Sequence, residues 1–237
     1  MDTSLTGTES VIKRVTGNLT RLLFIIAGPS GVGKNTIIRK ILANHQPLFD
    51  RIRTYTTRQK RDDEIPDEQY HFVSPEDFHA LALAGRLLEV DENNVGHDVY
   101  GLGEVYSMPR NLFQDVRPEC YLVIAEVDIH GMRLLKSYYE PAVSIFIAAE
   151  PRDLIERIMD RRDATMDAET LAQRMRTAHD QISAAREFDY VVFNQDEQLE
   201  KTVAEIETIM LAERMRVRSG FDLEALLPAE AYELSPQ

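Results

Sequence analysis

Three residues near the start of the chain have the types and the spacing of a phosphate-binding loop. Gly28, Gly33 and Lys34 match the first seven positions of the pattern G-x-x-x-x-G-K-[ST], and Asn35 takes the eighth position, where Ser or Thr is usual. Glycines permit a tight turn whose backbone N–H groups point at phosphate oxygens, and the helix N-terminus that follows adds partial positive charge. Lys34 would then reach the β- and γ-phosphates of a nucleoside triphosphate.

The residue after the lysine bears on the metal ion. A hydroxyl at this position is usually a Mg²⁺ ligand, whereas the carbonyl oxygen of Asn35 would coordinate the ion, or one of its waters, with a different geometry. The loop therefore predicts triphosphate binding more firmly than it predicts fast catalysis. The residues expected to bind ATP through this loop are Gly28, Pro29, Ser30, Gly31, Val32, Gly33, Lys34, Asn35 and Thr36.

The elements around the loop predict an α/β fold. The apolar run 22–27 predicts a buried strand, and the isoleucines after the loop predict a helix to about residue 44. The runs 121–128 and 143–147 are nearly unbroken and apolar, which is typical of parallel strands buried on both faces. Helices are expected at about 74–85, 131–138, 168–186 and 195–216, with a short strand at 190–193. This alternation predicts a parallel sheet core flanked by helices, with an inserted mixed α/β lobe at about 52–103.

The composition limits the classes of partner. The 237 residues are 43% hydrophobic and carry a formal net charge of −13, which argues against nucleic-acid and anionic-membrane partners. Cys120 is the only cysteine, so an internal disulfide and a Cys-rich zinc site are excluded. With no signal peptide or membrane span recognised, we expect a cytoplasmic protein, with loose extensions at 1–19 and 213–237. The oligomeric state is left open.

A phosphate ligand in so acidic a chain requires a local cluster of cations. Such a cluster occurs in 51–61, as Arg51, Arg53, Arg58, Lys60 and Arg61. From charge alone, a solvated loop balanced by the acids at 62–64 explains the cluster equally well.

Further motifs follow the loop in a fixed order. They are Thr56-Thr57-Arg58-Gln59-Lys60-Arg61, Tyr70-His71-Phe72-Val73-Ser74, Leu88-Glu89, Tyr100-Gly101, Glu126-Val127-Asp128-Ile129-His130-Gly131, Arg157 with Arg161, and Phe188-Asp189-Tyr190-Val191-Val192-Phe193-Asn194. With these motifs, the chain resembles guanylate kinase, a nucleoside monophosphate kinase of the phosphate-loop class, over about 20–212. The resemblance implies the P-loop NTP hydrolase fold, with the inserted lobe binding GMP and a helical lid at about 157–175. It also implies transfer of the γ-phosphoryl group of ATP to GMP, with Mg²⁺ as cofactor.

The resemblance also implies a role for each matched residue. Arg58, Arg61, Tyr70 and Tyr100 would bind the GMP phosphate, and Glu89, Asp128 and Thr54 would bind guanine. Asn194 would bind ATP, and Asn35 and Glu126 would lie at Mg²⁺ or its waters. Lys34, Arg157, Arg161 and Arg174 would be catalytic, the three arginines acting from the lid. The alternative is that these three arginines have no catalytic role and lie on helix surfaces, where each pairs with an acidic residue four positions away.

Two departures from the family pattern bear on activity. Asn35 replaces the usual hydroxyl, and Leu102 stands where Ser or Thr usually contacts guanine, so one base contact is lost. A reduced rate or a shifted acceptor is therefore left open. Two alternatives are a related small-molecule kinase, such as ribose 1,5-bisphosphate phosphokinase, and a non-catalytic guanylate-kinase-like binding module.

Overall fold

The computed structural model describes most of the chain between residues 21 and 216. The described ranges are 21–45, 48–61, 64–88, 96–98, 103–140, 142–150, 152–154, 168–195 and 198–216, with the backbone alone described for 168–174. The predicted extension at 1–19 lies outside these ranges, and so does the predicted extension at 213–237 from residue 217 onward.

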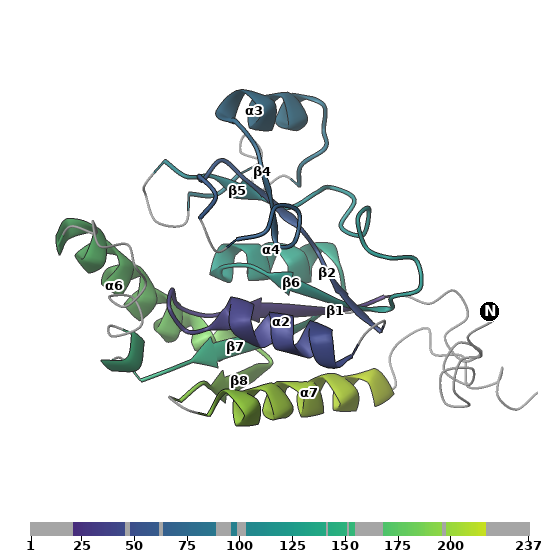
Figure 1. The fold of residues 1–237 in the computed structure, drawn as a ribbon, viewed down its shortest axis with the longest axis vertical. Helices are drawn as coiled ribbons and strands as arrows, with labels where there is room; N and C mark the ends of the chain where they lie inside the picture. The colour runs from purple at the N-terminus through teal and green to yellow at the C-terminus, as the bar shows by residue number, and fades with distance from the viewer. Residues whose placement is uncertain are drawn as a thin grey trace, which may run out of the picture.

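A five-stranded parallel sheet forms the centre of the molecule (Figure 1). Its strand order is β2-β6-β1-β7-β8, for strands β1 Leu22–Ala27, β2 Phe49–Arg51, β6 Leu122–Glu126, β7 Ala142–Ala148 and β8 Tyr190–Phe193. Ile26 of β1 lies opposite Glu126 of β6 and Ile145 of β7. Every residue of β1 is buried, as expected for a central strand covered on both faces. This confirms the predicted parallel sheet core flanked by helices.

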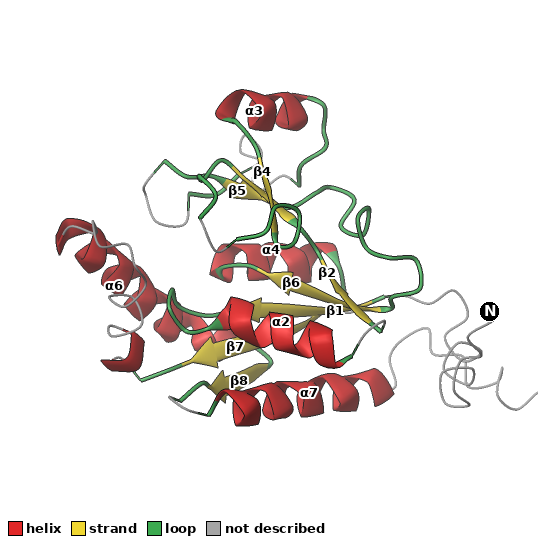
Figure 2. Cartoon of the chain, viewed as in Figure 1, coloured by secondary structure: helices red, strands yellow, loops and turns green. Residues whose placement is uncertain are grey.

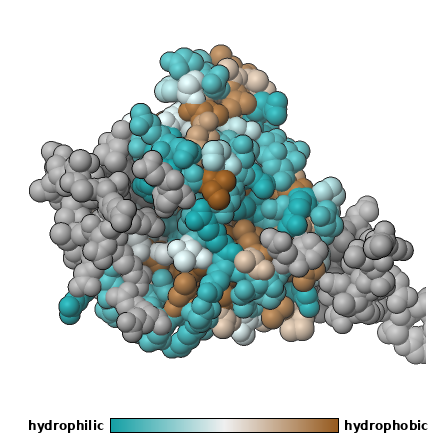
Figure 3. Space-filling model, in the orientation of Figure 1, coloured by the Kyte–Doolittle hydropathy of each residue, from teal (hydrophilic) through white to brown (hydrophobic). Residues whose placement is uncertain are grey.

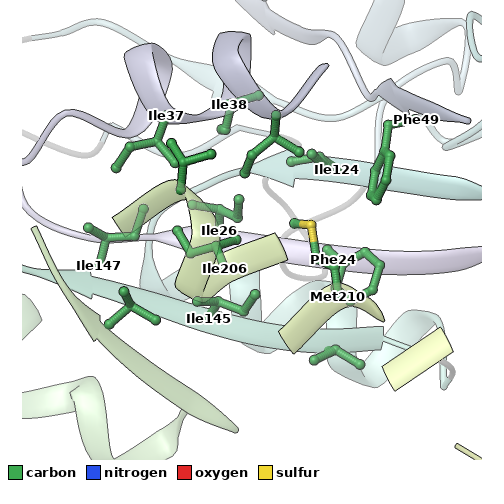
Figure 4. Close-up of a cluster of buried hydrophobic side chains, with 14 of the residues drawn as sticks. Phe24, Ile26, Ile37, Ile38, Phe49, Ile124, Ile145, Ile147, Ile206 and Met210 are labelled. Carbon is green, nitrogen blue, oxygen red and sulfur yellow. The ribbon is translucent and has the colours of Figure 1, made fainter. Parts of the chain in front are cut away.

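Helices cover both faces of the sheet (Figure 2). On one face, α2 Lys34–Asn44 and α7 Leu199–Met215 lie side by side and pack on alternate residues of β1, Leu22, Phe24 and Ile26 (Figure 4). On the other face, α4 Ile129–Tyr138 packs on the residues between them, Leu23, Ile25 and Ala27. A further helix, α6 Ala168–Ser183, is followed by a 3-10 turn, η1 Ala184–Glu187.

A second, smaller sheet stands beside the first. Its order is β4-β3-β5, for strands β3 Thr54–Thr56, β4 Tyr70–Phe72 and β5 Tyr106–Ser107. β3 pairs parallel with β4 and antiparallel with β5. Helix α3 Pro75–Leu83 follows β4, and the Ser74 hydroxyl caps it by accepting from the Asp77 N–H at 3.0 Å. In Figure 1 this sheet and α3 lie above the central sheet.

Several element boundaries differ from those expected from the sequence. The inserted lobe, expected from about residue 52, begins its sheet at Thr54 of β3, because the Ile52 N–H still donates to the Ile124 carbonyl of β6 in the central sheet. α4 begins at Ile129, two residues before the predicted start, because the Asp128 side chain caps it. α7 begins at Leu199 and extends to Met215, past the predicted domain boundary at residue 212.

The surface is mainly polar on the face drawn in Figure 3. Hydrophobic side chains on this face occur in small separate patches rather than as one continuous area. Within the described ranges, no helix has the length and apolar character needed to cross a membrane.

The packing of α7 on the central sheet gives a stability prediction. Ile206 is fully buried on α7, whereas Leu211 on the same helix is 40% exposed. Ile206→Ala removes buried methyl groups and leaves a cavity, so the free energy of unfolding should fall by about 2–5 kcal/mol. Urea denaturation with an unchanged m-value measures this loss. Leu211→Ala is the matched control, and an equal loss in both variants would contradict the described packing.

Candidate active site

The phosphate-binding loop joins the carboxyl end of β1 to the N-terminus of α2. At Gly28, an added Cβ would lie 2.3 Å from the Ile147 carbonyl oxygen, so a side chain cannot be accommodated. At Gly33, which precedes α2, the backbone has φ of 92° in the left-handed region, where glycine carries no steric cost. The first hydrogen bond of α2 runs from the Ile37 N–H to the Gly33 carbonyl at 3.1 Å. In an α-helix the N–H groups before this bond have no acceptor within the helix, and such an N-terminus favours an anion.

Lys34 lies across the loop that it follows. Its ammonium donates to the Gly28 carbonyl at 2.8 Å and to the Pro29 carbonyl at 3.2 Å. These contacts hold the charge of Lys34 at the loop, where the phosphates of a triphosphate would bind.

Asn194 fixes the loop from the end of β8. Its side-chain amide donates to the Val32 carbonyl at 2.8 Å, and its carbonyl oxygen accepts from the Thr202 hydroxyl at 3.1 Å. Asn194 is buried, and an added Cβ at Gly33 would lie 2.8 Å from its amide nitrogen. The residue expected to bind ATP thus also supports the shape of the phosphate loop.

A buried polar cluster lies beside the loop. The Asn35 carbonyl oxygen accepts from Arg51 Nη1 at 3.3 Å, and Arg51 Nη2 donates to Glu126 Oε2 at 3.1 Å. The same carboxylate oxygen accepts from the Gln69 amide at 2.8 Å. The side chains of Arg51 and Glu126 are only 3% and 10% exposed. Asn35 and Glu126, the two residues assigned to the metal, are therefore brought together by one guanidinium.

This donor set fits a magnesium ion that brings ligands of its own. Mg²⁺ usually binds one or two protein oxygens and takes its other ligands from water and substrate phosphates. Asn35 and Glu126 offer such a pair. Among the residues that the structure describes, no group of three or more His, Cys, Asp or Glu side chains could hold a metal without a substrate.

Arg58 is the central cation of the second sheet. Its guanidinium donates to both oxygens of Glu64, at 3.0 and 2.7 Å, and to the Tyr106 hydroxyl at 3.2 Å. It also lies over the rings of Tyr70 and Phe72, at 5.5 and 5.4 Å from their centroids. Burial opposes the charged form, but the hydrogen bond to Glu64 and the nearby tyrosines raise the pKa of Arg58 above its usual value. This guanidinium therefore stays charged, with its two Nη groups directed at a two-oxygen acceptor, here the Glu64 carboxylate.

The carboxylate partner of Arg58 is held ionised. Burial favours the protonated form of Glu64, yet the hydrogen bonds from Arg58 and from the Arg61 backbone N–H lower its pKa below the usual value. Tyr70 behaves differently: its burial, with the neighbouring carboxylate of Glu126, raises its pKa well above the usual range, so its hydroxyl stays protonated. Tyr70 can therefore donate a hydrogen bond to a phosphate.

Asp128 lies just past the carboxyl end of β6. Its Oδ1 accepts from the Gly131 N–H at 2.8 Å, and its Oδ2 lies 2.9 Å from His97 Nδ1. Burial raises the pKa of Asp128, but the close contact with His97 and the hydrogen bond from Gly131 outweigh this and lower it below its usual value. The His97 ring in turn stacks near His130, with centroids 4.3 Å apart. A fixed carboxylate with two histidines beside it thus borders the second sheet.

Some predicted site residues come together and others cannot be located. At the carboxyl ends of the central strands lie the loop residues, Asn35, Glu126 and Asp128. Arg58 and Tyr70 lie on the second sheet or directly beside it. Thr54 is buried at the start of β3, and its N–H donates to the Gln69 carbonyl at 3.2 Å. Glu89, Tyr100, Leu102, Arg157 and Arg161 lie outside the described residues, and only the backbone of Arg174 is described, in α6.

Sequence reasoning did not predict the contacts of four residues of this region. They are Arg51, Gln69, His97 and Tyr106, which contact Glu126, Asp128 or Arg58. Arg51 had a partial signal, since it belongs to the cation cluster at 51–61 of an otherwise acidic chain, but that cluster does not identify Glu126 as its partner. The other three had none, because they approach their partners only through the folding of the second sheet.

The contact between His97 and Asp128 predicts a dependence of stability on pH. The close contact with the Asp128 carboxylate raises the pKa of His97 above its ordinary value, although burial opposes this. The pair therefore stabilises the fold fully below the unfolded pKa of about 6.5, and this contribution is lost as the pH rises through the raised folded pKa. The stabilisation that comes from the lowered pKa of Asp128 is present above its unfolded pKa and is lost only in acid.

Nuclear magnetic resonance titration of the His97 ring tests this pair. Asp128→Asn should lower the pKa of His97. In this variant the free energy of unfolding should also decrease less as the pH rises above neutral. Asp98→Asn is the control, because Asp98 raises the pKa of His97 only through a weaker charge interaction. A His97 pKa that is unchanged in Asp128→Asn would disprove the pairing.

Comparison with known proteins agrees with this geometry. The family model described as guanylate kinase matches residues 20–213. The guanylate kinase of Symbiobacterium thermophilum is 35% identical over 208 residues, which cover 87% of this chain and 93% of that protein. The guanylate kinase of Thermosynechococcus vestitus is 35% identical over 191 residues, with 80% and 93% covered.

A solved structure shares the fold. The crystal structure of guanylate kinase from Anaplasma phagocytophilum superposes with a TM-score of 0.66 and 24% identity, covering 92% of this chain and all of that one (100%). The family match spans most of the chain, from the strand before the phosphate loop to the end of α7. This chain belongs to the guanylate kinase family.

Proposed function

We propose that this chain transfers the γ-phosphoryl group of ATP to GMP, giving ADP and GDP. The observation that carries the proposal is a continuous set of contacts between the two halves of the site. Asn35, next to the loop lysine, contacts Arg51, and Arg51 pairs with Glu126. Glu126 in turn accepts from Gln69, which directly precedes Tyr70 of the second sheet. A triphosphate site and a monophosphate site joined in this way suit direct transfer between two nucleotides.

The donor half would bind ATP through the loop and Lys34. The backbone N–H groups of 28–36 would hold the β-phosphate, and Lys34 would bring its charge to the β- and γ-phosphates. Asn194, which holds the Val32 carbonyl, would keep this loop in the binding shape. Bound with ATP, Mg²⁺ would neutralise charge on the phosphates, and Asn35 and Glu126 would hold the ion or its waters.

The acceptor half would bind the GMP phosphate through Arg58, Arg61 and Tyr70, with Tyr100 beside them. Arg58 already donates two hydrogen bonds to the two oxygens of Glu64, and two oxygens of a phosphate can accept the same pair of bonds. Guanine would be recognised by Glu89 and Asp128, because a carboxylate accepts from the base N1–H and 2-amino groups together, with Thr54 nearby. Adenine lacks that pair of donors.

The lid residues complete the proposed site. Arg157, Arg161 and Arg174 would stabilise charge on the transferred phosphoryl group and exclude water when the lid closes. We propose that the enzyme acts on free nucleotides in the cytoplasm, since the net charge of −13 disfavours nucleic acid and the single cysteine precludes an internal disulfide.

One assay tests the reaction and its acceptor. ADP formation from Mg²⁺·ATP is measured with GMP, dGMP, AMP, UMP and ribose 1,5-bisphosphate. Turnover with the guanine nucleotides supports the proposal. Turnover with the sugar phosphate alone would overturn it, and GMP binding without turnover would indicate a binding module instead.

Removal of the loop lysine should abolish transfer. Lys34→Ala takes the cation from the β- and γ-phosphates, so turnover should be lost while GMP binding, measured by calorimetry, is largely retained. Lys40→Ala on the same helix is the control, because Lys40 pairs with Glu200 of α7 and not with the phosphate loop. Wild-type turnover in Lys34→Ala would refute the assignment of the donor site.

Replacing the Arg58 guanidinium by an ammonium should weaken GMP binding. Arg58→Lys keeps the charge but not the two parallel donors, and a hydrogen bond to a charged group is worth about 1.5–3 kcal/mol. The KM for GMP should therefore rise by about 10- to 100-fold with little change in the KM for ATP. Arg53→Lys is the control, since Arg53 donates to the Asp67 and Asp115 carbonyls. An equal rise in both variants would argue against phosphate binding by Arg58.

A further inference from the structure

Arg51 is a buried cation at the boundary between the two sheets. It is the last residue of β2, and its guanidinium contacts both side chains that are expected at a divalent ion, Asn35 and Glu126. Nη1 donates to the Asn35 amide oxygen at 3.3 Å, and Nη2 donates to the Glu126 carboxylate at 3.1 Å. A fixed positive charge therefore already occupies the place where a metal would find its protein ligands.

The charges of this cluster cancel. Glu126 and Arg51 form a neutral pair, and their neighbours Asn35 and Gln69 carry no charge. A free divalent ion that approached Glu126 would meet the guanidinium at the same carboxylate oxygen, in a buried setting where water screens the repulsion weakly. An ion bound to triphosphate does not face this barrier, because the phosphates supply the missing negative charge.

The guanidinium also keeps one unused donor. Arg51 Nε is buried, and among the described residues it has no hydrogen-bond partner. A buried N–H without an acceptor is costly, so an oxygen that arrives with a ligand would be favoured here.

We propose that Arg51 is a positioning residue that makes binding of the divalent ion depend on the triphosphate. It holds the Asn35 and Glu126 side chains in place and keeps both oxygens from binding a free ion, so that the ion enters with ATP. The amide at position 35 fits this role, since the shorter side chain of a serine would not reach as far toward Arg51. The inference rests on the proposed function for its use in catalysis, but its contacts can be tested without nucleotide.

Electron paramagnetic resonance of Mn²⁺ provides that test. Without nucleotide, the wild-type protein should bind Mn²⁺ with a Kd that is roughly millimolar or weaker, and added ATP should bring the ion into the site. Micromolar binding of Mn²⁺ by the nucleotide-free wild-type protein would overturn the proposal without the need for any variant.

Variants of Arg51 test the cause. Arg51→Met frees Asn35 and Glu126, and it should strengthen nucleotide-free Mn²⁺ binding by about tenfold or more. Arg51→Gln should act in the same direction, and because its amide can still donate to Glu126, it serves if Arg51→Met does not fold. Arg51→Lys keeps the charge and should bind Mn²⁺ as weakly as the wild type. Asn35→Ala combined with Arg51→Met should lose part of the gain.

The matched control is Arg53→Gln. It removes the same charge two residues away, from a side chain bonded to the Asp67 and Asp115 carbonyls. Equal Mn²⁺ affinity in Arg51→Gln, Arg53→Gln and the wild type would refute the role of Arg51. These results do not depend on turnover: a gain in Mn²⁺ affinity with no GMP kinase activity in the wild type would uphold this inference and overturn the proposed function instead.

Discussion

The parallel pairing of β1 with β6 and β7 is the constraint on which the rest of the structure depends. All six residues of β1 are buried, and each face of the strand supplies one of the two hydrophobic clusters. Because the three strands run in the same direction, their carboxyl ends meet at one edge. The phosphate loop after β1 therefore lies together with Glu126 and Asp128 at the end of β6 and with the Ile147 carbonyl of β7. Without this pairing, the loop and the acids would share no edge.

Within that frame, the cations of an acidic chain are placed by carboxylates. Arg58 is held by Glu64, and Arg51 is held by Glu126, in pairs that are largely buried. Breaking such a pair by removing one member is costly, since the other charge stays buried. An arriving phosphate can replace Glu64 on Arg58 without leaving that guanidinium unpaired. The net charge of −13 is thus compatible with anionic substrates, because the positive groups are local and already oriented.

The sequence was sufficient to predict the core and the donor loop, because both depend on local patterns. The apolar runs at 22–27 and 143–147 and the spacing of Gly28, Gly33 and Lys34 each carry their meaning within a few residues. Contacts between distant segments could not be predicted in this way. The pairing of Arg51 with Glu126 joins residues 75 positions apart, and that of His97 with Asp128 requires the second sheet to fold beside β6. The cap at Asp128 was also missed, because a residue expected to bind a base was not considered as a helix start.

The hydrogen bond from Asn194 to the phosphate loop has a consequence for the folding of the chain during synthesis. Asn194 and Val32 are 162 positions apart, and Asn194 is itself held by Thr202 on α7. During synthesis the loop and α2 leave the ribosome early, but the side chains that fix them emerge only with the last described helix. A nascent chain that lacks α7 also lacks Ile206 and the other α7 side chains that cover one face of β1. A nucleotide bound to this loop would therefore stabilise the fold only after Asn194 and α7 have been translated.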